Sequence, residues 1–155
     1  MTSKATRRNL LIAGGAGLVA AGALPRPAQA HAMTDSEKAN VKFVTDFVKG
    51  WEAKKYDADK EYAFYLAPEA SVRMEEDKPP LIGPAAVAAE SKKFMAGGAR
   101  IEVKIHDTFA RGPVVVNART DIIKAPGKPD QEFKVAGVFV VKKGKIAEWT
   151  DYLVA

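Results

Sequence analysis

From residue 101 onward the chain consists of four segments in which apolar and polar residues alternate, and this pattern constrains the fold more than any other feature. Side chains on a β-strand point alternately to opposite faces, so the alternation predicts strands with one buried face. Short turn signals separate the segments, which favours antiparallel neighbours, with Lys143-Gly144 as a tight hairpin. The first predicted strand begins at Ile101, and the next three are Val114–Lys124, Phe133–Val141 and Lys145–Val154.

The part of the chain before residue 101 has a helical pattern instead. Thr34 and Glu37 have capping-box spacing, and apolar residues then recur at helical intervals, which predicts an amphipathic helix ending near Lys55. A second, shorter helix is expected through Leu66 and a third over Ala85–Met95. Asp57 or Asp59 can cap the start of the second helix, and Pro68 is expected to end it. A short strand is predicted over Ala70–Glu76, and Gly97-Gly98 is expected to end the third helix.

This order of elements predicts an α+β fold. Helices that are segregated from a run of antiparallel strands pack on one side of the sheet. We therefore expect a curved, mostly antiparallel sheet that wraps around the N-terminal helices as a cone. The apolar mouth of such a cone is a natural place for a small ligand.

Residues 1–30 have the features of an export signal. The pair Arg7-Arg8 precedes a Gly- and Ala-rich apolar run, and Ala28-Gln29-Ala30 resembles a signal-peptidase site. Adjacent arginines followed by Leu-Leu resemble the twin-arginine class, so we predict a periplasmic protein cleaved after Ala30 or Ala32. An ordinary secretory signal would lead to the same compartment, whereas a start at Met33 would leave the protein in the cytoplasm. The mature part is predicted to be one domain, residues 31–155.

Charge and cysteine content exclude several function classes. The formal net charge is +5, but residues 1–30 hold four of the 24 Lys and Arg residues and none of the 19 acidic ones. The rest of the chain is therefore nearly neutral, at +1, which argues against nucleic-acid binding. Without cysteine there is no thiolate chemistry, and His31 and His106 alone do not suggest a metal site. We also expect no stable membrane insertion once the signal is removed.

Two strands carry charges where an apolar face is expected. Arg119 and Asp121 share one face of the second strand, and Trp149 and Asp151 share one face of the last. Burying a charge is costly unless a partner compensates, so these residues predict either a functional site or a surface ion pair with no function.

The residues around these charges resemble a known family. Asn117-Ala-Arg119-Thr-Asp121, Val135-Ala-Gly137-Val-Phe139 and Gly144–Tyr152 are similar to segments of limonene-1,2-epoxide hydrolase and its SnoaL-like relatives in the nuclear-transport-factor-2-like superfamily. The resemblance implies the cone-shaped fold, a small apolar substrate, no metal or organic cofactor, and a homodimer.

The resemblance also implies roles for the charged residues. Arg119 would bridge the two carboxylates, Asp121 would protonate the epoxide oxygen and Asp151 would take a proton from the attacking water. The chemistry requires one neutral and one ionised carboxyl group, and two close acids in a dry pocket meet that requirement.

One part of the family's site is absent. A tyrosine and an asparagine that hold the water in the family are replaced here by residues in the segment Arg73–Glu76. The remaining candidates for positioning water are therefore Arg73, Glu75, Glu76, Tyr62 and Tyr65, and one of the two tyrosines is expected to turn inward.

The identity of the substrate depends on pocket residues that are scattered along the chain. The sequence therefore leaves both the substrate and the reaction open. An isomerase, cyclase or lyase could use the same acid and base without water, and a non-catalytic module could use the pocket for binding. The residues predicted to line the pocket are Trp51, Phe64, Phe94, Phe139 and Trp149.

Overall fold

The computed structural model describes residues 32–154, and the predicted export signal lies outside the described residues. The first helix, α1, spans Asp35–Gly50, and the predicted capping box of Thr34 and Glu37 is present. Its apolar face is the predicted one, but the helix ends five residues earlier than Lys55, with Trp51 as its C-cap. None of the helices in the described part of the chain has both the length and the apolar content that a membrane crossing needs.

Two further helices follow. The second helix, α2, spans Ala58–Tyr65 and is capped by Asp57, whose side chain accepts a hydrogen bond from Lys60 N at 3.3 Å. The third helix, α3, spans Pro84–Phe94 with a proline in its first turn, as predicted. A short 3₁₀ turn, η1, at Ala96–Gly98 then leads into the sheet.

Six strands form one sheet in the order β2-β1-β6-β5-β4-β3. All neighbouring pairs are antiparallel except β1 with β6, which is parallel. The fold is therefore the α+β arrangement expected from the sequence, with three helices and a mixed, mostly antiparallel sheet. The strands are β1 (Leu66–Arg73), β2 (Leu81–Ile82), β3 (Arg100–Arg111), β4 (Val114–Lys124), β5 (Gln131–Lys142) and β6 (Lys145–Leu153).

The region around β1 corrects the sequence-based prediction. Leu66 begins the strand instead of ending the helix, and Pro68 lies within the strand. A proline cannot donate a ladder hydrogen bond, and here it falls in the stretch between Leu66 and Ser71 where the register with β6 is interrupted. The strand ends at Arg73, so Glu75 and Glu76 lie in the following turn and not in the strand.

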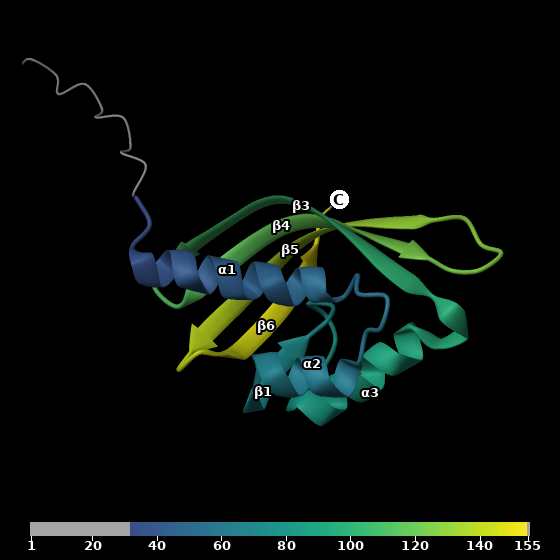
Figure 1. Cartoon of the computed structure of the whole chain (residues 1–155), viewed down its shortest axis with the longest axis horizontal. Helices are drawn as coiled ribbons and strands as arrows, with labels where there is room; N and C mark the ends of the chain where they lie inside the picture. Colours follow the sequence, from purple (N-terminus) through teal and green to yellow (C-terminus); the bar gives the residue numbers. More distant parts are fainter. Residues whose placement is uncertain (1–31, 155) are drawn as a thin grey trace, which may run out of the picture. The chain divides into compact units, whose positions relative to one another are not determined.

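The sheet curves over α1, which crosses it on one side (Figure 1). A β-bulge at His106 shifts the register between β3 and β4, because Ile105 pairs with Arg119 and Asp107 with Ala118. Bulges increase the bend and twist of a sheet. The hairpin between β5 and β6 turns on Lys143 and Gly144 with φ of 50° and 71°, the left-handed pair that a tight two-residue turn requires.

The core lies between α1 and the concave face of the sheet. Phe47 is fully buried, and its ring lies 5.3 Å from Trp51, 6.3 Å from Phe139 and 5.5 Å from Trp149. These edge-to-face contacts fix the C-terminal end of α1 against β5 and β6. The charged residues of β4 and β6 lie beside this aromatic cluster.

Candidate active site

Arg119, Asp121 and Asp151 meet on the concave face of the sheet, although β5 separates the strands that carry them. Gly137 of β5 pairs with Asn117 of β4 and with Asp151 of β6, so it lies directly between the charged groups. A Cβ atom at Gly137 would come within 2.5 Å of Arg119 Nη1 and 2.9 Å of Asp151 Oδ1. The absence of a side chain at this position therefore allows Arg119 to reach across β5.

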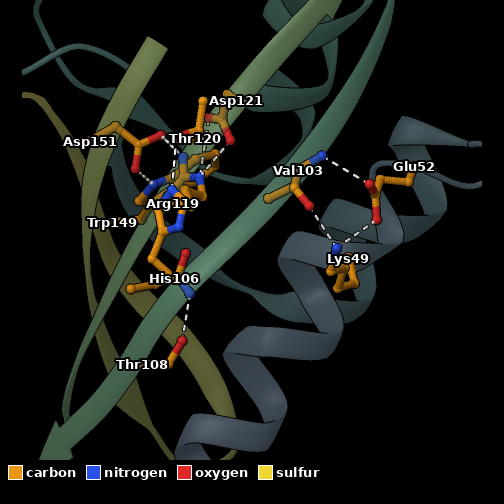
Figure 2. Close-up of polar contacts among 11 residues, drawn as sticks. Lys49, Glu52, Val103, His106, Thr108, Arg119, Thr120, Asp121, Trp149 and Asp151 are labelled. Atoms are coloured by element: carbon orange, nitrogen blue, oxygen red, sulfur yellow. Dashed lines mark hydrogen bonds and ion pairs between the residues drawn. The ribbon is translucent and has the colours of Figure 1, made fainter. Parts of the chain in front are cut away.

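The guanidinium of Arg119 lies between the two carboxylates (Figure 2). Its Nε donates to both oxygens of Asp121, at 2.9 and 3.1 Å, and its Nη2 donates to Asp151 Oδ2 at 2.6 Å. The indole Nε1 of Trp149 donates to the other oxygen of Asp151 at 2.7 Å. The exposed fractions of Arg119, Asp121 and Asp151 are 1%, 8% and 6%, so the surface-pair interpretation is wrong.

Burial shifts the proton affinities of this cluster. It raises the pKa of Asp151 above its usual range, and the opposing charge of Arg119 and the hydrogen bond from Trp149 only partly offset this. Burial also raises the pKa of Asp121, Arg119 offsets part of that rise, and the charge of Asp151 adds to it. Burial alone would lower the pKa of Arg119, but the two carboxylates raise it, so the guanidinium stays charged. Because both pKa values are raised, a state with one carboxyl neutral and the other ionised is favoured over one with both ionised.

Aromatic rings form the wall behind the charges. Trp149 is stacked between Trp51, at 5.4 Å between ring centroids, and Phe139, at 5.7 Å. The Cζ atom of Arg119 lies 5.2 Å from the ring of Trp51, within the range of a cation–π contact. In these surroundings of low polarity, electrostatic interactions are stronger than in water.

A cavity of about 690 Å³ opens in front of the two carboxylates. Both Asp121 and Asp151 line it, and most of its remaining wall is apolar. Its volume is typical of a site for a small organic molecule. The other lining residues are Trp51, Tyr56, Tyr62, Met74, Glu75, Lys78, Pro79, Pro80, Leu81, Glu90, Ser91, Phe94, Met95, Ile101, Ile123, Phe133, Val135, Trp149 and Leu153.

The structure places three of the five predicted pocket residues in this wall, namely Trp51, Phe94 and Trp149, and corrects the other two. Phe139 is fully buried in the core behind Trp149, because the strand position that faces inward there is covered by other rings. Phe64 is 61% exposed on α2, where its ring contacts Tyr65 edge-to-face and has Lys145 Nζ 5.2 Å from its centroid.

Only some of the residues predicted to position water lie at the cavity. Tyr62 is 3% exposed and lines the cavity, and Glu75 lies at its edge. Glu76 accepts a hydrogen bond from Leu153 N at 3.1 Å, and Arg73 and Tyr65 are not among the lining residues.

The side of β1 that faces the site is apolar. Val72 pairs with Trp149 and is fully buried, and Met74, two residues further along the same side, lines the cavity. His106 is exposed, as expected, and lies 2.9 Å from Thr120 Oγ1.

Sequence reasoning missed three residues of the site. Gly137 had a signal, because a glycine inside a strand often marks the close approach of another group. Ser91 follows Val87 by one helical turn on the buried face of α3, which is a weaker signal. Tyr56 lies in the loop after α1, where no local periodicity predicts the direction of a side chain.

The residues described give no indication of a metal centre. Within residues 32–154 there is no group of three or more His, Cys, Asp or Glu side chains placed to hold a metal ion. The groups that are present can supply an acid, a base and a fixed positive charge.

Comparisons with known proteins agree with this arrangement. A sequence model of the limonene-1,2-epoxide hydrolase catalytic domain matches residues 38–155. Epoxide hydrolase EphG of Mycobacterium tuberculosis is 43% identical over 58 residues, a match that spans 37% of this chain and only 38% of that relative.

Solved structures share the fold over most of the chain. An epoxide hydrolase from M. tuberculosis, described as similar to limonene-1,2-epoxide hydrolase, superposes with a TM-score of 0.65 at 25% identity, over 77% of this chain and 85% of that one. A protein from Jannaschia sp. CCS1, named for its likeness to SnoaL-like polyketide cyclases, has a TM-score of 0.68 at 16% identity, over 79% and 90% of the two chains.

Proposed function

This chain belongs to the limonene-1,2-epoxide hydrolase family, and on that premise we propose that it hydrolyses an apolar epoxide to a diol by general acid–base catalysis. The observation that carries the proposal is the pair Asp121 and Asp151, both held by Arg119 in the wall of an apolar cavity. Opening an epoxide with water requires a proton donor at the ring oxygen and a proton acceptor at the water, and the pair supplies one of each.

The hydrogen bonds suggest which carboxyl group takes which role. Each oxygen of Asp151 accepts its own hydrogen bond, one from Trp149 and one from Arg119, which favours the ionised form and the role of base. Both oxygens of Asp121 share the single N–H at Arg119 Nε, which stabilises its charge less and suits the proton donor.

The reaction balances with water as the only co-reactant. The oxygen of water forms a bond to one epoxide carbon while the bond from that carbon to the ring oxygen breaks. Asp151 receives a proton from the water, and Asp121 gives its proton to the ring oxygen. A proton then returns from Asp151 to Asp121 through solvent, and Arg119 keeps the two carboxyl groups at a fixed separation and shields their charges throughout.

The cavity wall suggests the class of substrate. Its wall includes aromatic and aliphatic side chains such as Phe94, Phe133 and Val135, and the charged residues in it besides the two aspartates are Lys78, Glu75 and Glu90. An epoxide on a small or medium apolar skeleton fits these surroundings, because its only polar atom would lie at the carboxylates.

A second candidate reaction has its own support. Val72 of β1 and Met74, just after the end of that strand, lie on the side that faces the site, and neither has a polar group to hold a water molecule. An isomerase, cyclase or lyase would need the same acid and base but no water. Product mass separates the alternatives, because hydrolysis adds one water to the substrate and the other reactions do not.

The test is turnover of a panel of terpene and aryl epoxides by the wild type, Asp121→Asn and Asp151→Asn. We expect diol formation by the wild type and a loss of about 10²- to 10⁴-fold in each variant, the usual contribution of a general acid or base. Turnover that is equal in all three proteins would contradict the proposal. A ligand that binds tightly, is recovered unchanged and binds both variants equally would favour a binding module.

We also propose a homodimer formed through the convex face of the sheet. Val116 pairs with Val138 and Ala118 with Ala136, and these side chains are only partly buried on the face opposite the helices. An apolar patch of this kind on a monomer commonly marks an interface. Light scattering should give twice the mass of one chain, and Val138→Lys should reduce it to one.

We further propose export to the periplasm, which rests on Arg7-Arg8 and on Ala28-Gln29-Ala30. Expression with the full leader should give a periplasmic product that begins at His31 or Met33. Replacing Arg7-Arg8 with two lysines should leave the precursor in the cytoplasm, and a mature protein that starts at Met1 would contradict export.

A further inference from the structure

The cavity contains a second polar group besides the carboxylates. Three residues that carry hydroxyl groups line it, namely Tyr56 in the loop after α1, Tyr62 on α2 and Ser91 on α3. These residues come from three separate elements, and they line the same cavity as Asp121 and Asp151. The same cavity therefore brings phenol groups to an acid–base pair.

These hydroxyls are buried and incompletely paired. Tyr62 is 3% exposed and Ser91 is 8% exposed. The Tyr56 hydroxyl is buried without a hydrogen-bond partner among residues 32–154. A buried polar group without a partner is costly, which indicates that water or a ligand completes the cluster.

Tyr62 is held rigidly in this position. Its ring lies 5.9 Å from Phe47 and 6.5 Å from Tyr56, and both contacts are edge-to-face. Because Phe47 also contacts Trp149, the same core ring supports both the phenol and the residue that donates to Asp151.

The negative charge of Asp151 affects the pKa of Tyr62. Burial raises the pKa of Tyr62, the hydroxyls of Ser91 and Tyr56 oppose that rise, and the negative charge of Asp151 adds to it. Burial also raises the pKa of Tyr56, and the charge of Asp151 is not among the causes of that rise. A phenol with a raised pKa stays neutral and can both donate and accept a hydrogen bond.

The neighbouring positions on this side are apolar or already bonded. They are Val72 of β1 and Met74 just after its end, and the donor at Trp149 is bonded to Asp151. Tyr65, one helical turn after Tyr62, packs against Phe43 and Phe47 and does not line the cavity.

We infer that the hydroxyl of Tyr62 holds the attacking water against Asp151, with Tyr56 and Ser91 orienting that hydroxyl; the inference rests on the proposed hydrolysis. The water donates one hydrogen to Asp151 and the other to Tyr62 Oη, while the Tyr62 hydrogen is donated to Tyr56 or Ser91. As the bond from oxygen to carbon forms, the proton moves to Asp151, and Asp121 protonates the oxygen that leaves the carbon. Tyr62 is neutral before and after the step.

The test compares Tyr62→Phe with Tyr65→Phe, which removes the same atom from a neighbouring tyrosine outside the cavity. We expect kcat/KM of Tyr62→Phe to fall about 10²-fold through kcat, with KM and the unfolding temperature unchanged. Tyr65→Phe is expected to match the wild type. In Tyr62→Phe the share of isomeric carbonyl product should also rise, because an epoxide protonated without a positioned water can rearrange by a hydride shift.

The outcomes separate this inference from the proposed function. If the wild type hydrolyses an epoxide and Asp151→Asn abolishes the reaction, but Tyr62→Phe matches the wild type in rate and product, the role of Tyr62 is wrong and the hydrolysis stands. If the wild type forms no diol from any epoxide, both fall. If Tyr62→Phe is unstable, the double variant Tyr56→Phe/Ser91→Ala gives the second readout: a smaller loss of kcat with the same product shift supports the inference, and unchanged kinetics overturn it.

Discussion

Two charged clusters differ in their place on the sheet: one joins β4 and β6 in the cavity wall, and the other lies at the edge strand β3 (Figure 2). At the edge, Lys49 Nζ donates to the carbonyl of Val103 at 2.6 Å, and Val103 N donates to Glu52 at 2.9 Å. These bonds satisfy the backbone of β3, the last strand of the sheet, and link it to the end of α1. The side chains of Lys49 and Glu52 remain 46% and 30% exposed, so both keep part of their hydration.

The cluster around Arg119 differs in every one of these respects. Its three members are buried, the pKa values of both aspartates are raised by burial, and Arg119 Nη1 has no hydrogen-bond partner within the described residues. The edge cluster satisfies the backbone of an edge strand, whereas the buried cluster holds charges beside a mostly apolar cavity. The first cluster therefore contributes to the fold, and the second, which we propose as the catalytic one, is held at some cost in stability.

Among the substitutions that test this difference between the clusters, Arg119→Met should have the largest effect on stability and turnover. It leaves two buried carboxylates without their counter-charge, and breaking a buried pair of this kind costs about 3–5 kcal/mol. We expect a loss of that size in the free energy of unfolding at neutral pH and no detectable turnover. The loss should shrink in acid, because the carboxyl groups are then protonated, and urea titrations at both pH values check this. A uniform loss at all pH values would contradict the charge-based explanation.

Trp149→Phe should have the next largest effect. It removes the hydrogen bond to Asp151 Oδ1, and hydrogen bonds to charged groups contribute about 1.5–3 kcal/mol. That bond holds the pKa of Asp151 down, so its loss should raise this pKa further. Because the base must be ionised, the acid limb of the pH–rate profile should move to higher pH. A shift to lower pH would contradict the assignment of Asp151 as the base.

Gly137→Ala tests the path by which Arg119 crosses β5. The added methyl group would overlap Arg119 Nη1, and inserting a methyl into a packed site typically costs about 1–3 kcal/mol. We expect reduced stability and reduced kcat together, measured by thermal unfolding and epoxide turnover. Full activity in a stable Gly137→Ala protein would show that Arg119 does not need this gap.

Glu52→Gln should have the smallest effect. Glutamine keeps an acceptor for Val103 N and loses only the partly exposed ion pair with Lys49, which is 3.1 Å long. Exposed pairs contribute less than about 1 kcal/mol, so stability should change little and turnover not at all. A loss as large as that of Arg119→Met would remove the distinction between the two clusters.

The fold was predictable where the local sequence pattern determines the structure. The helical spacing of Val44, Phe47 and Val48 predicted the buried face of α1, and the alternation along β4 to β6 predicted antiparallel strands. The parallel pairing of β1 with β6 was not predictable, because no local pattern specifies a partner that far along the chain. Pro68 was interpreted as a stop, whereas an irregular register accommodates it inside β1.

The site was predictable only in part, because a local sequence pattern does not specify tertiary contacts. Alternation placed Arg119 with Asp121 and Trp149 with Asp151, and the structure brings these residues together. Alternation also placed Phe139 on the inner face, but it cannot distinguish a core position from one that lines the cavity. Tyr56 comes from a loop, where the direction of the side chain depends on tertiary contacts alone.

The most direct test of the central claim is a single-turnover reaction in water labelled with ¹⁸O, with enzyme in excess over an epoxide substrate. If Asp151 activates water as a general base, the diol formed in that first turnover carries one labelled oxygen and the protein carries none. An unlabelled diol, with the label already in an aspartate carboxyl group after that first turnover, would show direct attack by the carboxylate and would contradict the proposed mechanism.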